Sequence, residues 1–249
     1  MNEERFTGKA EVYGKFRPSY PNEFIEYLYN DIGLKSDSKI ADIGAGTGIF
    51  SEILIKKGSH VYLVEPNSDM FGEAKKNLAE YKNCSYINAS AENTTLPDNS
   101  MDFLTSAQAF HWFDREKFKN ECRRILKPGG KVILAWNSRV ENDGLVMEND
   151  MINRKYCMAY KGFSAGQNMV DSAEYKAFFK AVEYKEFENN LYFDKAGFVG
   201  RNLSSSYAPA PTSENYSLYI NELQILFEKF QQNNRVMMSN ITVSYVGAV

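Results

Sequence analysis

The sequence is poor in the residue types that cross-link small proteins or hold metal ions. Its 249 residues include three cysteines, Cys84, Cys122 and Cys157, and two histidines, His60 and His111. The cysteines are far apart along the chain, so they match neither a disulfide framework nor the close pairs of a zinc site. We therefore expect three ordinary cysteines and no metal centre.

Long apolar runs and a strong net charge are also missing. No stretch approaches the roughly 20 apolar residues that a membrane helix needs, and residues 1–5 lack the apolar segment of a signal peptide. With 29 basic and 32 acidic residues, the net charge of −3 gives no field that would attract nucleic acid or an anionic membrane. We expect a soluble, cytoplasmic protein that acts on a small or locally recognised partner.

Short apolar runs alternate with segments of helical spacing between residues 39 and 136, a pattern typical of βαβ units and a parallel sheet. The expected strands are 40–43, 61–64, 85–88, 101–105 and 131–136. The expected helices are 49–57, a second beginning at the N-cap Ser68, and a third that begins at the N-cap Asp114 and ends at residues 127–130. Asp102, at the start of the fourth strand, is expected to be structural.

The second half of the chain shows weaker patterns. Residues 140–181 have faint helical periodicity, 183–193 alternate like a strand, 215–230 have helical spacing, and 241–245 alternate again. A last helix and two last strands would complete the sheet. No linker separates the halves, so we expect one domain: a lead-in or lid (1–38), a cofactor-binding core (39–139), and a substrate-side insertion with closing strands (140–249).

A glycine-rich turn at residues 42–48, with the sequence DIGAGTG, lies between the first expected strand and helix. Glycines let a backbone turn sharply and approach a ligand closely. Ile49 stands where a dinucleotide fingerprint needs glycine or alanine, and no Gly-Lys-Ser/Thr of a P-loop follows. Glu65 ends the second strand, where a carboxylate can accept hydrogen bonds from both ribose hydroxyls. Either feature alone also fits a structural role; together they predict an adenosine-type ligand.

Five motifs in this order resemble the core of the class I S-adenosylmethionine-dependent methyltransferases. They are residues 42–48, Glu65-Pro66, Ser90-Ala91-Glu92, residues 96–102 (LPDNSMD) and residues 126–130 (LKPGG). Residues 107–114 and 13–21 are similar to the subgroup that contains trans-aconitate-type and other small-molecule methyltransferases. The resemblance covers residues 40–139.

The resemblance implies a doubly wound, Rossmann-like α/β sheet of seven strands, mostly parallel with the last strand antiparallel. S-adenosylmethionine would lie across the carboxyl ends of the first and fourth strands and leave as S-adenosylhomocysteine. Gly44 and Gly46 would pass beneath the methionine, Glu65 would hold the ribose, Ala91 and Glu92 would border the adenine, and Gln108 would face the methionine end. Asp42, Ala45 and Pro66 complete the cofactor-binding residues that we expect within these motifs.

Methyl transfer from a sulfonium is an in-line displacement that depends mainly on orientation of the acceptor. His111 is the candidate base, because its ordinary pKa suits it to accept a proton near neutral pH, and it also fits a role in the pocket wall. Arg17 and Tyr13, in the lead-in, are expected at the cofactor, with the Arg17 guanidinium facing its carboxylate. A small-molecule acceptor is expected; a nicotinamide-dependent oxidoreductase, a non-catalytic binding module and an RNA methyltransferase remain the alternatives.

Overall fold

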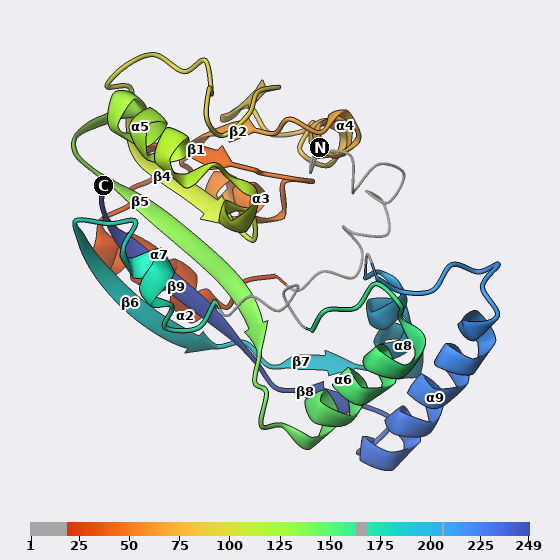
Figure 1. The fold of residues 1–249 in the computed structure, drawn as a ribbon. Helices are drawn as coiled ribbons and strands as arrows, with labels where there is room; N and C mark the ends of the chain where they lie inside the picture. Colours follow the sequence, from red (N-terminus) through yellow and green to blue (C-terminus); the bar gives the residue numbers. More distant parts are fainter. Residues whose placement is uncertain (1–18, 163–168, 206) are drawn as a thin grey trace.

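The computed structural model describes residues 19–162, 169–205 and 207–249. Its centre is a seven-stranded sheet with the strand order β3-β2-β1-β4-β5-β9-β6 (Figure 1). The strands are β1 (Lys39–Ile43), β2 (His60–Val64), β3 (Cys84–Ile87), β4 (Met101–Ala107), β5 (Leu126–Arg139), β6 (Ala181–Glu188) and β9 (Asn240–Ala248). The first five are parallel to one another, and β9 pairs antiparallel with both β5 and β6. The expected sheet with an antiparallel last strand is confirmed.

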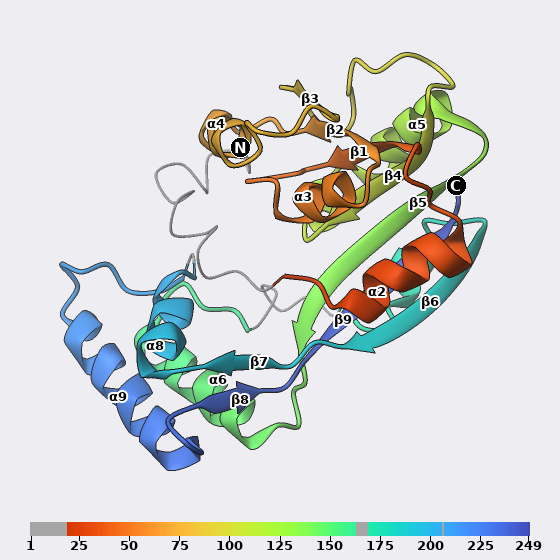
Figure 2. The same cartoon turned by 180° about the vertical axis from the view of Figure 1, so that it is seen from behind.

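Helices cover both faces of this sheet. One face carries α5 (Arg115–Ile125) and the short α7 (Ala173–Lys176), and the other carries α2 (Asn22–Tyr27), its continuation η2 (Leu28–Ile32), and α3 (Ile49–Lys56), with α4 (Ser68–Asn77) contributing to the same core (Figures 1 and 2). Successive strand residues point to opposite faces, so Ile40 packs with α3 while Ala41 packs with α5. The doubly wound α/β class predicted from the sequence is therefore confirmed.

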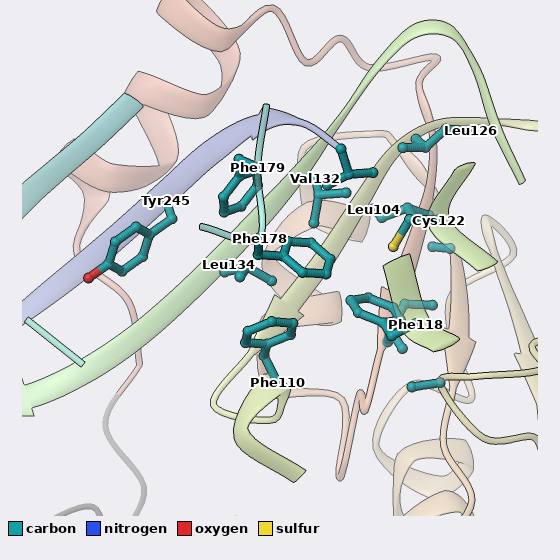
Figure 3. Packing of buried hydrophobic residues seen from close by; sticks show 14 of the residues in the cluster. Leu104, Phe110, Phe118, Cys122, Leu126, Val132, Leu134, Phe178, Phe179 and Tyr245 are labelled. Atoms are coloured by element: carbon teal, nitrogen blue, oxygen red, sulfur yellow. The ribbon is translucent and has the colours of Figure 1, made fainter. Parts of the chain in front are cut away.

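Aromatic rings fill the core beneath α5 and α7 (Figure 3). Phe118 of α5 stacks on Phe178, with 5.7 Å between the ring centroids, and Phe110 meets Phe178 edge to face at 4.8 Å. Such offset and edge-to-face contacts add to the free energy gained by burying the rings. Phe178 follows α7, so this packing fastens a poorly patterned part of the sequence to the sheet.

A second unit with its own core extends from the end of β5. We call it the helical unit; it consists of α6 (Gly144–Tyr156), α8 (Lys195–Leu203), α9 (Asn215–Phe230) and the hairpin β7 (Leu191–Phe193) and β8 (Val236–Met238). Phe198, Tyr219 and Phe227 are buried at its centre. The helical expectation for residues 140–181 holds for α6 and α7, while α8, β8 and the pairing of β7 in a separate sheet were not expected.

The alternating segment 183–193 is two strands rather than one. β6 ends at Glu188 and β7 begins at Leu191 in a separate sheet. At the break, the Asn189 backbone N–H donates to the Asn240 carbonyl at 2.8 Å, and the Asn190 side chain accepts from the Asn240 N–H at 3.2 Å. The side chain of Asn190 thus takes a position in the ladder that backbone would otherwise fill, and the chain leaves the sheet.

Two local expectations also need correction. The N-cap of α4 is Asn67, whose Oδ1 accepts from the N–H groups of Asp69 and Met70 at 3.1 and 3.0 Å, and not Ser68, which is the first helical residue. The glycine pair expected to end the third helix lies inside β5, as a bulge between the pairs Met101–Leu126 and Phe103–Lys131. Gly129 has a φ of 82° there, a backbone conformation that glycine supplies.

Asp102 fastens this bulge to the first strand. Its Oδ2 accepts from the backbone N–H of Lys39 at 2.8 Å, and its Oδ1 pairs with Nζ of Lys127 at 2.7 Å. These two bonds lower the pKa of Asp102 despite partial burial. Asp102 therefore has the structural role that the sequence indicated.

Part of the expected lead-in belongs to the core. In α2 and η2, Phe24, Leu28 and Ile32 are buried against the sheet, and Phe24 stacks on Phe50 of α3 at 6.0 Å. Among the described helices, none has the length and apolar character needed to cross a bilayer.

Candidate cofactor site

The glycine turn and the acidic end of β2 are joined by hydrogen bonds at the carboxyl edge of the sheet. Oε2 of Glu65 accepts from the N–H of Gly46 at 2.9 Å, and Oε1 accepts from the N–H of Asn67 at 2.9 Å. The turn is also tied to β2 because the Gly44 N–H donates to the Val64 carbonyl at 2.8 Å. Glu65 is only 8% exposed, so it is packed against the glycine turn and is not a solvated strand end.

The two glycines of the turn serve different purposes. Gly44 and Gly46 have φ values of 69° and 58°, a region that side-chain-bearing residues rarely adopt. A Cβ on Gly44 would lie 2.5 Å from Cβ of Ala109, whereas a Cβ on Gly46 would meet nothing within 4 Å. Gly44 is required for packing beneath the end of β4, and Gly46 borders open space where a ligand can approach the backbone.

Asp42 supports the turn from below. Its carboxyl is 1% exposed and accepts from Oγ of Ser51 at 2.5 Å and from Oγ1 of Thr105 at 2.8 Å. Burial raises the pKa of Asp42 to about 6, and the nearby Glu65 carboxylate contributes to the rise. Through these bonds Asp42 of β1 holds α3 and β4 in place beside the turn. Its role in the candidate site is therefore to support the turn from within the core.

The residues expected around the adenine lie beyond β3. Ala91 is buried, and Oε1 of Glu92 accepts from the backbone N–H of Asp114 at 2.9 Å. The Pro66 carbonyl accepts from the side-chain amide of Asn88 at 3.2 Å. The segment after β3 is thus linked both to the end of β2 and to the start of α5.

Gln108, directly after β4, has a φ of 63°. Its N–H donates to the Ala135 carbonyl at 2.9 Å, and its side-chain amide donates to the Asn137 carbonyl at 3.3 Å. A left-handed backbone at a residue other than glycine is uncommon and concentrates at functional sites. Bonds to β5 hold this conformation and place Gln108 at the same edge as the glycine turn.

Asn137 was not singled out from the sequence. Its Oδ1 accepts from Oγ1 of Thr242 at 2.6 Å and from the amide of Asn189 at 3.0 Å, and its own amide donates to the Ser19 carbonyl at 3.2 Å. It thereby connects β5, β9, the end of β6 and the N-terminal chain beside Gln108. The sequence did offer a signal, because Asn137 is a polar residue directly after the apolar run 132–136.

His111 lies in the short helix η3 (Phe110–Trp112). Nε1–H of Trp136 donates to Nδ1 of His111 over 3.5 Å, which places the ring proton of the neutral imidazole on Nε2. Burial, assisted by the charge of Arg115, lowers the pKa of His111 from 6.5 to about 4. The pKa of His111 in the folded protein is thus lower than the ordinary value on which its expected role as a base rested, and that role stays a prediction.

Tyr13 and Arg17 lie outside the described residues, so their expected contacts stay predictions. The described chain begins at Ser19, whose carbonyl also accepts from the Asn189 amide at 3.0 Å. Across the described ranges, no group of three His, Cys, Asp or Glu side chains could hold a metal ion.

A parallel sheet of this order with an antiparallel seventh strand, a glycine turn after β1 and an acid closing β2 defines the class I methyltransferase fold. A sequence profile described as a methyltransferase domain matches residues 41–134. This match identifies residues 41–134 as a methyltransferase domain, and together with the fold it supports assignment to the class I S-adenosylmethionine-dependent methyltransferases that the sequence resembles.

Similar proteins agree with this assignment. An uncharacterized methyltransferase of Mycobacterium tuberculosis is 35% identical over 143 residues, 57% of this chain and 56% of that protein. A ubiquinone/menaquinone biosynthesis C-methyltransferase of Vibrio cholerae is 33% identical over 110 residues, 41% of this chain and 42% of that one. The chain thus spans about half the length of these relatives.

The fold as a whole is also found in solved structures. One from Anaeromyxobacter dehalogenans, assigned as a type II methyltransferase, superposes with a TM-score of 0.67 at 20% identity, over 94% of this chain and 98% of that one. Neither this structure nor the two relatives above names the trans-aconitate-type subgroup, so that finer assignment stays a prediction.

Proposed function

We propose that this protein transfers a methyl group from S-adenosylmethionine to a small-molecule acceptor by in-line displacement. The observation that carries the proposal is the bond between Gly46 and Glu65, which joins the glycine turn and the ribose-type carboxylate at one edge of the sheet. A glycine turn and a carboxylate placed together in this way fit an adenosine ligand without phosphates, and the turn lacks the glycine spacing that favours a pyrophosphate.

The residues present fit the cofactor. Gly46 leaves open the space that a side chain would fill, so a ligand can lie against the turn. A carboxylate offers about four acceptor sites, so Glu65 can hold two backbone N–H groups and also receive ribose hydroxyls. Ala45, Pro66, Ala91 and Glu92 would border the nucleoside.

Bound S-adenosylmethionine would supply an electrophilic methyl group on a sulfonium. The contribution of the chain is then to bind, orient and exclude water, and orientation of this kind can contribute roughly 7–11 kcal/mol to lowering a barrier. Gln108, held in its uncommon backbone conformation, would define the methionine end. His111 is neutral and presents an Nε2–H donor, so we propose that it forms the wall of the acceptor pocket rather than serving as a strong base.

A small acceptor agrees with the balanced charge of the chain, which provides no general attraction for nucleic acid. The Vibrio cholerae relative is named for a biosynthetic C-methyltransferase, which is also small-molecule chemistry. The helical unit and the N-terminal chain at Ser19 stand at the edge where the acceptor would enter.

Calorimetry tests the cofactor assignment. We expect micromolar binding of S-adenosylmethionine and S-adenosylhomocysteine, and much weaker binding of NAD and ATP. Tight NAD binding without a response to S-adenosylhomocysteine would indicate an oxidoreductase and overturn the proposal.

Incubation with methyl-labelled cofactor and a metabolite extract, followed by mass analysis, tests turnover and the acceptor. A labelled small product supports the proposal. Label in RNA alone, or binding without any transfer, would replace it with one of the two alternatives on the same fold.

A further inference from the structure

Exposed apolar side chains are concentrated on the helical unit. Among the described residues, the large hydrophobic side chains with high exposure are Met147, Met151, Met158, Tyr192, Leu218, Ile225 and Met237. All of them lie in or beside α6, α9 and the β7–β8 hairpin, and none lies in the cofactor-binding core. A concentration of this kind on a folded protein marks a contact surface rather than a random scatter.

Two ion pairs show how α6 and α9 lie against each other. Nζ of Lys155 is 3.2 Å from Glu222, and Nζ of Lys229 is 2.7 Å from Glu148. The pairing of a later residue of α6 with an earlier residue of α9 means that the helices are antiparallel, as Figures 1 and 2 show. The ion pairs therefore bridge the groove between the helices at two levels.

Apolar side chains occupy the levels between and beside these pairs. Met151 is three residues after Glu148, and Ile225 is three residues after Glu222, so each lies on the same side of its helix as the charged residue before it. Met151 is 60% exposed and Ile225 56% exposed. Met147 extends the row by about one turn of α6, and Leu218 lies about two turns before Ile225 on α9. We call this row, Met147, Met151, Leu218 and Ile225, the α6–α9 stripe.

The charges around the stripe are self-complementary. α6 carries Glu148 and then Lys155, and antiparallel α9 carries Glu222 and then Lys229. The four residues mark the corners of a square in which each glutamate is diagonal to the other and each lysine is diagonal to the other. A second copy turned about a two-fold axis along the helices would place Glu148 over the partner's Lys229. A two-fold axis across the helices would place Glu148 over the partner's Lys155. In both arrangements every corner meets its opposite charge.

This pattern points to one occupant. An isologous contact requires a patch that complements itself under a two-fold rotation, and here apolar side chains lie between and beside charged pairs of opposite sign. We propose that the protein forms a homodimer in which the α6–α9 stripes of two copies pack face to face. The proposal concerns a surface away from the glycine turn and does not depend on the catalytic assignment.

Sedimentation velocity tests the apolar part of the proposal. We expect the native protein to sediment as a dimer in the micromolar range, and the double variant Met151→Lys with Ile225→Lys to sediment as a folded monomer by circular dichroism. Tyr192→Lys is the matched control, because Tyr192 is 61% exposed on β7 outside the stripe, and it should remain a dimer. A native monomer throughout the range, or a dimer of the double variant, would overturn the proposal.

Charge reversal tests the self-complementarity independently. Glu148→Lys with Glu222→Lys makes the four charges of the two ion pairs all positive, and Lys155→Glu with Lys229→Glu makes them all negative. Each variant alone should be monomeric, and an equimolar mixture should form heterodimers. Two variants that each still form homodimers, or a mixture that stays monomeric, would contradict the proposed contact. Binding of S-adenosylhomocysteine should be unchanged in all of them, which separates this test from that of the proposed function.

Discussion

The backbone N–H of Gly46 lies 2.9 Å from Oε2 of Glu65, so the turn that follows β1 and the acid that closes β2 form one hydrogen-bonded unit. A change in either residue therefore alters the position of the other. The cofactor site is better tested by comparing matched substitutions within this unit than by removing single contacts.

Glu65→Ala should weaken binding of S-adenosylhomocysteine by tenfold to several hundredfold, because hydrogen bonds to a charged group each contribute about 1.5–3 kcal/mol. The melting temperature of the ligand-free protein should fall as well, since the bonds from Gly46 and Asn67 are lost. Calorimetry and thermal unfolding measure the two effects. Glu80→Ala, at an exposed position, is the control; affinity of Glu65→Ala within twofold of the native protein would exclude the ribose role.

Glu65→Gln should give an affinity between those of the native protein and the alanine variant. The amide keeps one acceptor oxygen, but its NH2 group must face one of the two backbone N–H donors. We therefore expect a measurable loss of ligand-free stability together with the intermediate affinity. Native-like values of both in thermal unfolding and calorimetry would show that the charge and geometry of the carboxylate are dispensable.

Gly46→Ala should leave the protein folded but reduce cofactor binding by at least about tenfold. The methyl group would enter the open space beside the turn, and the left-handed backbone would cost roughly 1–2 kcal/mol. Gly129→Ala is the matched control, because Gly129 also has a positive φ and open surroundings but lies in the β5 bulge. Equal affinities of the two variants would contradict a ligand at Gly46.

Gly44→Ala should act mainly on stability, because its Cβ would clash with Ala109 at 2.5 Å. Overpacking of this kind costs about 1–3 kcal/mol, and a valine should cost more. Urea unfolding measures the loss. A Gly44→Ala protein as stable as the native one would mean that the end of β4 moves aside easily.

His111 should give the protein an acid-sensitive stability. Because its folded pKa is about 4 and its ordinary value 6.5, the unfolded chain binds more protons between these values, and the free energy of unfolding falls as pH drops through this window. Relative to His111→Asn, the native protein should lose about 2 kcal/mol between pH 7 and pH 4.5. Urea unfolding at both pH values measures it, and a difference that does not change with pH would contradict the lowered pKa.

Asp42 should give the free energy of unfolding the opposite dependence on pH. Its pKa rises from 3.8 to about 6 in the folded protein, so its contribution to stability is present below pH 3.8 and is lost as pH rises through 6. Asp42→Asn removes this loss and should gain about 2 kcal/mol relative to the native protein between pH 4 and pH 7. Urea unfolding of both proteins at the two pH values checks the sign; a relative loss would refute it.

The parallel half of the fold could be read from the sequence because its signals are local. Strands buried on both faces are short apolar runs, and Asp114 caps α5 through a bond to the N–H of Lys117 that lies three residues away. The glycine turn and Glu65 were recognisable for the same reason, since each stands at the end of such a strand. The bond that joins them crosses between strands, and only the structure shows it.

The remainder depends on contacts between distant segments. Asn189 and Asn190 interrupt an otherwise regular alternation because they bond to Asn240, fifty residues further along the chain. The lowered pKa of His111 likewise results from its burial and from Arg115, which spacing in the sequence does not express. Helix α2 and its continuation η2 were the exception: Phe24, Leu28 and Ile32 have helical spacing and could have been read as a core helix.

Short segments of chain connect the helical unit to the sheet. Three of the described links are short: residues 140–143 after β5, residues 189–190 between β6 and β7, and Ser239 between β8 and β9. Val140 donates to the Ser239 carbonyl at 3.0 Å, so two of these links are themselves bonded together. Because the unit encloses its own core, substitutions inside it need not disturb the packing around the glycine turn. If the proposed function holds, such an arrangement would let substitutions in the helical unit change the acceptor side of the protein while the cofactor side stays constant.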